Sequence, residues 1–144
     1  MLTFTNIRNV RNGMYDKVYA PVRSLKNPSP WMEQVADLSP SPALLGAYLK
    51  LKKEGNWNQN TFQRIYVPQF LTEIRHNKNA CQWLNFLYTE DKAGRNIALV
   101  CFCPDEALCH RSILAGMLKA VGAKVRTDGL EPFTGYYDMF RQIA

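Results

Sequence analysis

The sequence predicts a small three-layer α/β domain with a mostly parallel sheet of three to five strands. The strongest observation is residues 97–103 (IALVCFC), which are apolar almost throughout, as is typical of a strand covered on both faces in a parallel sheet. A helical pattern follows up to Val121, and a second strand is expected at 124–127, so this segment forms a βαβ unit. Strands and helices also alternate along the rest of the chain, which favours the α/β class.

The first 42 residues contain two predicted strands and a long loop. Residues 2–7 alternate enough to form a short strand, and a second strand is expected at 17–22, where Pro21 ends it. Residues 27–42 hold four prolines and several turn-forming residues. We therefore predict an ordered loop there, with one helical turn around residues 32–37.

Three helices are predicted before the βαβ unit. Ser41 and Pro42 give an N-cap and a first-turn proline for a helix that ends at Gly55. A second helix is expected to open at Asn60-Thr61, with a kink at Pro68 and an apolar stripe at every fourth residue: Phe62, Tyr66, Phe70 and Ile74. A third helix is expected at 80–88.

The C-terminal residues predict one more helix, which would dock on the core. Its apolar side chains recur at helical spacing: Tyr136, Met139, Phe140 and Ile143.

The composition is that of one soluble globular domain spanning residues 1–144. The chain is 47% hydrophobic and 21% charged. No apolar run approaches the roughly 20 residues of a membrane span, and the first residues lack the pattern of a secretory signal. We therefore expect no membrane association and a cytoplasmic location. There the four cysteines should be reduced, so thiol chemistry or metal ligation competes with simple burial.

The chain is basic, with a net charge of +6 and a pI near 9.3. Much of the excess lies in residues 1–30, which hold five basic residues and one acidic residue. Phosphate-bearing partners are therefore expected, either a phosphorylated small molecule or a nucleic acid. A well-solvated basic surface is the alternative interpretation.

Residues 101–112 (CFCPDEALCHRS) concentrate the chemistry of the chain. Cys101 and Cys103 should share one face of the strand, with Cys103 at its carboxyl end, where open α/β sheets bind ligands. His110, Arg111 and Ser112 should form the first turn of the next helix. Cations at a helix N-terminus are unfavourable by about 0.3–1 kcal/mol unless a negative group lies nearby.

Two kinds of group could supply that negative charge. In the structural interpretation it comes from the acidic side chains of Asp105 and Glu106. In the functional interpretation it comes from a bound phosphate or carboxylate, held by the helix amides, Arg111 and His110.

Catalysis and metal binding both remain open at these residues. The spacing excludes the phosphatase Cys-Arg loop, the P-loop and the deaminase motif. A Cys103 thiolate activated by His110 is a candidate nucleophile, and Cys109 is a further catalytic candidate. Zinc could take Cys101, Cys103, Cys109 and His110, although this spacing is not a common zinc pattern. Alternatively, Cys101 is a buried small hydrophobe.

The stretch LVCFCPDEALCHRSILAGML resembles the signature of the domain-of-unknown-function family numbered four hundred and eighty-eight, in a divergent branch. In that family an apolar strand ends in Leu-Leu-Cys, and Cys-His-Arg opens a helix eight residues later; Cys101 and residues 109–111 match these positions. An acidic residue often found two positions after the first Cys is replaced here by Cys103. The Val-Arg-Ser at 22–24 is similar to one that follows an early strand in the family.

The resemblance implies a Rossmann-like α/β domain and no settled activity. It also implies that Arg23 leaves the carboxyl end of one strand while residues 103–111 leave the end of another. If those strands are neighbours, Arg23, His110 and Arg111 line one crevice.

Taken together, the sequence favours binding of a phosphorylated small molecule, a nucleotide or a nucleic-acid end. The expected ligand-binding residues are Arg23, Ser24, His110, Arg111 and Ser112. Trp31 and Trp57 lie in polar surroundings, where each either stacks on a base or covers the edge of the core. The alternatives are a zinc-stabilised interaction module without catalysis, and a basic nucleic-acid-binding protein that uses its N-terminal third. No motif for an organic cofactor is present.

Overall fold

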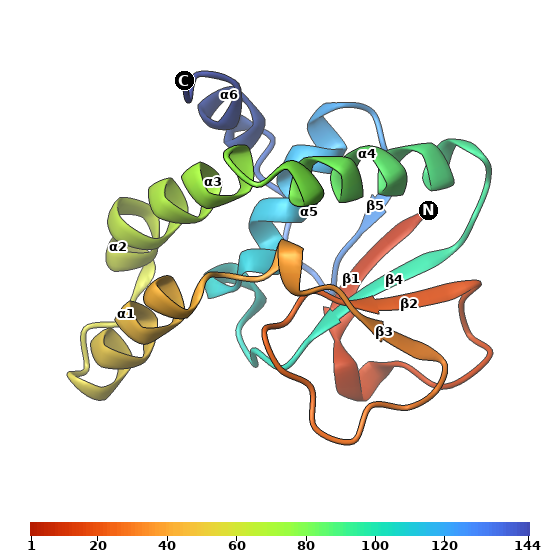
Figure 1. Cartoon of the computed structure of the whole chain (residues 1–144), viewed down its shortest axis with the longest axis horizontal. Helices are drawn as coiled ribbons and strands as arrows, with labels where there is room; N and C mark the ends of the chain where they lie inside the picture. The colour runs from red at the N-terminus through yellow and green to blue at the C-terminus, as the bar shows by residue number, and fades with distance from the viewer.

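The structure is a computed structural model that describes all 144 residues. Its centre is a five-stranded, all-parallel sheet flanked by helices (Figure 1), in the order β3-β2-β4-β1-β5. The strands are β1 (Leu2–Asn6), β2 (Lys17–Ala20), β3 (Met32–Gln34), β4 (Ile97–Cys101) and β5 (Val125–Arg126). The predicted Rossmann-like α/β class, with a mostly parallel sheet of three to five strands, is confirmed.

Six α-helices and four further helical segments make up the rest of the regular structure. The α-helices are α1 (Pro42–Lys53), α2 (Gln59–Thr61), α3 (Val67–Arg75), α4 (Lys78–Lys92), α5 (His110–Ala120) and α6 (Gly135–Arg141). The short segments are η1 (Ile7–Asn9), η2 (Ala36–Leu38), η3 (Phe62–Tyr66) and η4 (Glu106–Leu108); η3 is a π-helical turn and the others are 3-10 turns. No helix has both the length and the apolar character needed to cross a membrane.

Local capping chemistry explains where the helices begin. The Ser41 side chain accepts a hydrogen bond from Leu44 N, and Pro42 opens α1, as predicted. The second helical run starts earlier than Asn60, because Asn58 and Thr61 form a capping box. Similarly, Asn77 caps α4, which is longer than the predicted 80–88. The π turn η3 leads directly to the first turn of α3, which contains Pro68.

One predicted element is wrong. Residues 32–34 form the edge strand β3, whereas a helical turn was expected there; the only helical residues nearby are those of η2. Val18, Tyr19 and Ala20 of β2 pair in parallel with β3. This pairing is a long-range contact that the proline-rich local sequence does not indicate.

Two apolar clusters lie against the sheet. The larger contains 24 buried residues, including Leu2, Phe4 and Leu99 of the strands together with residues of α1, α3, α4, α5 and α6. The smaller contains Val18, Ala98 and Val100, together with residues of the segments that follow β1 and β2. Long helices therefore contribute to one cluster, and the other is closed mainly by loops around residues 7–15 and 22–31.

The strand order brings three chain segments to one edge of the sheet. β4 lies between β2 and β1, and all three strands run in the same direction. The segments that leave their carboxyl ends, beginning at Ile7, Pro21 and Phe102, therefore start close together. This confirms that the strands before Arg23 and before Cys103 are neighbours.

Candidate functional site

A pocket lies at the carboxyl ends of β2 and β4 and has a cavity volume of about 210 Å³. We call it the carboxyl-end pocket. It is lined by Val22, Arg23, Ser24, Pro40, Leu45, Tyr48, Trp57, Tyr66, Cys101, Phe102, Cys103, Leu108, Cys109 and His110. Of the five residues predicted to bind ligand, Arg23, Ser24 and His110 line the pocket, whereas Arg111 and Ser112 lie behind its wall.

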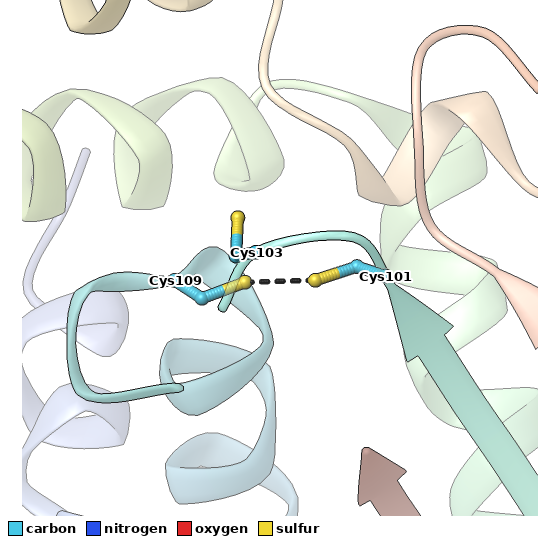
Figure 2. A group of neighbouring side chains, drawn as sticks. All are labelled: Cys101, Cys103 and Cys109. Carbon is cyan, nitrogen blue, oxygen red and sulfur yellow. Dashed lines mark hydrogen bonds between the residues drawn. The ribbon is translucent and has the colours of Figure 1, made fainter. Parts of the chain in front are cut away.

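Three cysteines form one side of the carboxyl-end pocket (Figure 2). Cys101 ends β4, Cys103 lies in the following loop, and Cys109 is the N-cap of α5. The Sγ atoms of Cys101 and Cys109 are 3.0 Å apart, and Figure 2 shows these two side chains pointing toward each other. All three Sγ atoms lie within 4.8 Å of one another, although β4 ends before Cys103. We call this group the cysteine cluster.

Arg111 is buried beneath the cysteine cluster, with 2% of its surface exposed. Its Nη1 donates hydrogen bonds to Cys101 Sγ at 3.1 Å and to the Cys103 carbonyl oxygen at 3.0 Å. Its Nη2 lies 3.6 Å from Asp128 Oδ2. Arg111 thus neutralises the Asp128 carboxylate. It also holds Cys101 and the Cys103 carbonyl oxygen in place at the base of the pocket.

The anion that balances Arg111 is Asp128, and not the acidic residues next to it in sequence. Asp105 instead caps η4 by accepting from Ala107 N, and the Glu106 carboxylate accepts from the amides of Asp128 and Leu130. The Glu106 bonds hold the segment after β5, where Asp128 lies, against the loop before α5.

His110 joins α5 to the loop after β2. Its Nε2 donates a hydrogen bond to the Pro21 carbonyl oxygen at 2.5 Å, and its ring packs edge-on against Phe70 with centroids 5.6 Å apart. Nδ1 is then the unprotonated nitrogen, 3.7 Å from Cys109 Sγ. Burial lowers the pKa of His110, which favours a neutral ring. His110 is therefore a neutral hydrogen-bonding group in the pocket wall.

Arg23 and Ser24 supply exposed polar side chains to the lining of the carboxyl-end pocket. The guanidinium of Arg23 donates from Nε and Nη2 to the Pro40 carbonyl oxygen at 3.3 and 3.1 Å. Its other nitrogen, Nη1, makes no hydrogen bond within the chain. By contrast, Ser112 Oγ donates to the Cys109 carbonyl oxygen and stabilises the first turn of α5.

The surroundings of the cysteine cluster favour one thiolate, on Cys101. Hydrogen bonds from Cys103 and Cys109, together with the charge of Arg111, lower the pKa of Cys101 despite its burial. The pKa of Cys103 is raised to about 11, chiefly by its hydrogen bond to Cys101, and burial raises that of Cys109. These directions favour the thiolate form at Cys101, next to Arg111, over the thiolate form at Cys103 or Cys109.

Three sulfurs this close could also hold a thiophilic metal ion such as zinc. Two sulfurs bound to a tetrahedral zinc ion at about 2.3 Å are about 3.8 Å apart. The Cys101–Cys109 separation of 3.0 Å is shorter than this, so ligation requires these sulfurs to move apart. His110 is not within the group of three: its Nε2 is bonded to Pro21, and its Nδ1 lies next to Cys109 alone.

Sequence reasoning missed several residues of this site. Asp128 gave no local signal, because it lies 17 residues after Arg111 and only the tertiary fold joins them. Asn6 Nδ2 donates to the Cys103 carbonyl oxygen at 3.2 Å, and Thr5 Oγ1 donates to Asp128 at 2.6 Å. Both end β1, so the neighbouring strand also positions the site.

The comparisons with known proteins identify the family. The searches of curated proteins and of solved structures gave no match. A family model described as "Active DUF488-N3 subclade" matches residues 9–122, which include the whole of the carboxyl-end pocket. This range covers most of the chain and confirms the predicted resemblance to a divergent branch. The chain therefore belongs to the DUF488 family, within its DUF488-N3 subclade.

Proposed function

We propose that this protein binds a small anionic ligand, of which a nucleoside monophosphate is the class that fits best, in the carboxyl-end pocket. The observation that carries the proposal is the pocket itself, which combines an exposed arginine, a helix N-terminus and aromatic walls. Such a combination, at the carboxyl ends of parallel strands, is where open α/β sheets bind ligands.

The charged part of the ligand would lie between Arg23 and the start of α5. The backbone amides of His110 and Arg111 donate to no acceptor within the chain. A helix N-terminus of this kind favours an anion. Arg23 Nη1 and the Ser24 hydroxyl face the same pocket, so both sides can donate hydrogen bonds to a phosphate.

The planar part of the ligand would lie against the aromatic wall. The pocket is lined by Tyr48, Trp57 and Tyr66, which pack edge to face. The ring centroid of Trp57 lies 4.6 Å from that of Tyr48 and 5.6 Å from that of Tyr66. Aromatic side chains of this kind stack on bases without requiring one particular base.

Catalysis is part of the proposal, because a thiolate lies next to the ligand. Cys101 carries the reactive sulfur, and Cys103, Cys109 and His110 would act with it as hydrogen-bonding partners. The matched family model is described as an active subclade, which favours catalysis over binding alone.

Isothermal titration with inorganic phosphate and with four nucleoside monophosphates tests the binding site. We expect Arg23→Ala to weaken binding about tenfold, because it removes a charge-assisted hydrogen bond. Arg11→Ala is the matched control, since Arg11 is also exposed and lies outside the pocket. Equal affinities for the wild type and for Arg23→Ala would rule out this site.

A zinc-stabilised module is the second candidate, favoured by the three sulfurs within 4.8 Å of one another. Elemental analysis of protein purified without chelator distinguishes it from the first. Less than about half an equivalent of zinc per chain would count against the metal site.

A further inference from the structure

The cysteine cluster contains a pair of sulfurs arranged for oxidation to a disulfide. Cys101 Sγ and Cys109 Sγ are 3.0 Å apart, which is about 1 Å longer than a disulfide bond. Both cysteines are free and buried, and both line the carboxyl-end pocket. A small movement of the two side chains is enough to join them.

Arg111 makes the two members of this pair chemically unequal. Its Nη1 is 3.1 Å from Cys101 Sγ and 4.0 Å from Cys109 Sγ, so the buried positive charge favours a thiolate on Cys101. The Cys109 thiol lies 3.0 Å from the Cys101 sulfur and can donate a hydrogen bond to it. The cluster thus offers a nucleophile and a neighbouring thiol that can donate a proton.

The cavity admits a small oxidant but shields the sulfurs from larger ones. Its volume of about 210 Å³ is several times the ~30 Å³ that one water molecule occupies in the liquid. Hydrogen peroxide, with two heavy atoms, therefore fits next to Cys101. A protein disulfide does not, because Cys101 and Cys109 are each only 1% exposed.

We propose that hydrogen peroxide entering the carboxyl-end pocket oxidises Cys101, and that Cys109 then closes a reversible Cys101–Cys109 disulfide. In the first step the Cys101 thiolate forms an S–O bond, the O–O bond breaks, and the leaving hydroxide takes from the solvent the proton that Cys101 had released, becoming water. In the second step Cys109 attacks the sulfenic sulfur, the S–S bond forms, and the hydroxyl leaves as water with the Cys109 proton. Overall, two thiols and one peroxide give one disulfide and two waters.

Cys103 has a different place in this scheme. Its sulfur is in the cluster, but Figure 2 shows its side chain directed away from the line that joins Cys101 and Cys109. Cys103 is therefore dispensable for the disulfide. The inference does not depend on the identity of the ligand proposed above.

Thiol trapping and mass spectrometry test the proposal directly. The reduced protein, in buffer with EDTA, is treated with one equivalent of hydrogen peroxide, blocked with N-ethylmaleimide and digested with trypsin and Glu-C. Trypsin leaves all three cysteines in residues 96–111, and Glu-C cuts after Glu106, separating Cys101 and Cys103 from Cys109. We expect the two fragments to remain joined until a dithiol reductant is added.

Variants assign the bond and its mechanism. Cys103→Ser should keep the joined fragments, and Cys81→Ser, in α4, is the matched control that should also keep them. Cys109→Ser should stop at a sulfenic acid on Cys101 that dimedone labels. Fragments that separate in the wild type, or that stay joined in Cys101→Ser and separate in Cys103→Ser, would overturn the proposal.

The charge on Arg111 gives a second, kinetic test. Arg111→Met should slow oxidation at least about tenfold, whereas Arg111→Lys should retain most of the rate because it keeps the positive charge. Circular dichroism confirms that each variant is folded before its rate is compared. Equal rates in the wild type and in folded Arg111→Met would contradict the role of Arg111.

Discussion

The guanidinium of Arg111 lies 3.6 Å from the carboxylate of Asp128 and so joins the start of α5 to the segment after β5. Arg111 is 2% exposed, whereas about a third of the Asp128 side chain is exposed. The charge at the base of the carboxyl-end pocket therefore depends on a residue from a different part of the chain.

Asp128→Asn should lower the free energy of unfolding by about 1–3 kcal/mol, because it removes a charged partner of the buried guanidinium. Urea denaturation measures the change. Asp138→Asn is the control, since Asp138 forms only an exposed ion pair with Arg141, and it should change stability little. An equal effect of the two substitutions would mean that Asp128 does not stabilise Arg111.

Gly116→Ala should destabilise the protein by about 2 kcal/mol through overpacking. A Cβ at Gly116 would lie 2.2 Å from the backbone carbonyl oxygen of Phe133, which cannot move as a side chain can. Gly46→Ala in α1 is the matched control, because nothing lies within 4 Å of its Cβ position; it should be neutral or slightly stabilising. Thermal unfolding compares the two, and a higher midpoint for Gly116→Ala would refute the close packing of α5 on this segment.

Asp91 should make the protein less stable in acid. Burial raises its pKa, but the ion pair with the N-terminal amino group and the hydrogen bond from the Lys124 amide outweigh this effect, so the net pKa is below the usual 3.8. The ionised form is thus stabilised by folding, and this contribution is complete above about pH 4 and lost as pH falls through the lowered pKa.

The stability difference between the wild type and Asp91→Asn should therefore be largest near neutral pH and shrink below pH 4. Chemical denaturation at several pH values measures it. A difference that is constant from pH 7 to pH 3 would exclude a lowered pKa at Asp91.

Trp57→Leu should weaken binding of nucleoside monophosphates about tenfold and leave inorganic phosphate unchanged, because stacking on one base contributes about 1–3 kcal/mol. Trp31→Leu is the control, since Trp31 lies outside the carboxyl-end pocket. Isothermal titration gives both affinities. A parallel loss for phosphate and nucleotides would show that Trp57 supports the pocket and does not contact a base.

The fold could be predicted largely because its strongest signals are local. The apolar run of β4, the proline at the start of α1 and the glycine after α5 act over a few residues. β3 was missed because an edge strand of three residues carries little pattern, and its pairing with β2 depends on distant residues.

The site was predicted in part. Neighbouring residues in the sequence identified the cysteines and Arg111, but the direction of the Arg111 side chain depends on Asp128 and on the Cys103 carbonyl oxygen. The ligand-binding role predicted for Arg111 and Ser112 stays a prediction. The aromatic wall formed by Tyr48 and Tyr66 depends on how α1 and η3 pack, which no local pattern reveals.

The position of β4 between β1 and β2 has a consequence for synthesis of the protein on the ribosome. β1 and β2 belong to the first 20 residues, yet each pairs with β4, which begins at Ile97. During translation the edges of β1 and β2 that face β4 must therefore stay unpaired until the central strand has left the exit tunnel. Nascent chains stalled before that point should be the ones that chaperones hold and proteases cut.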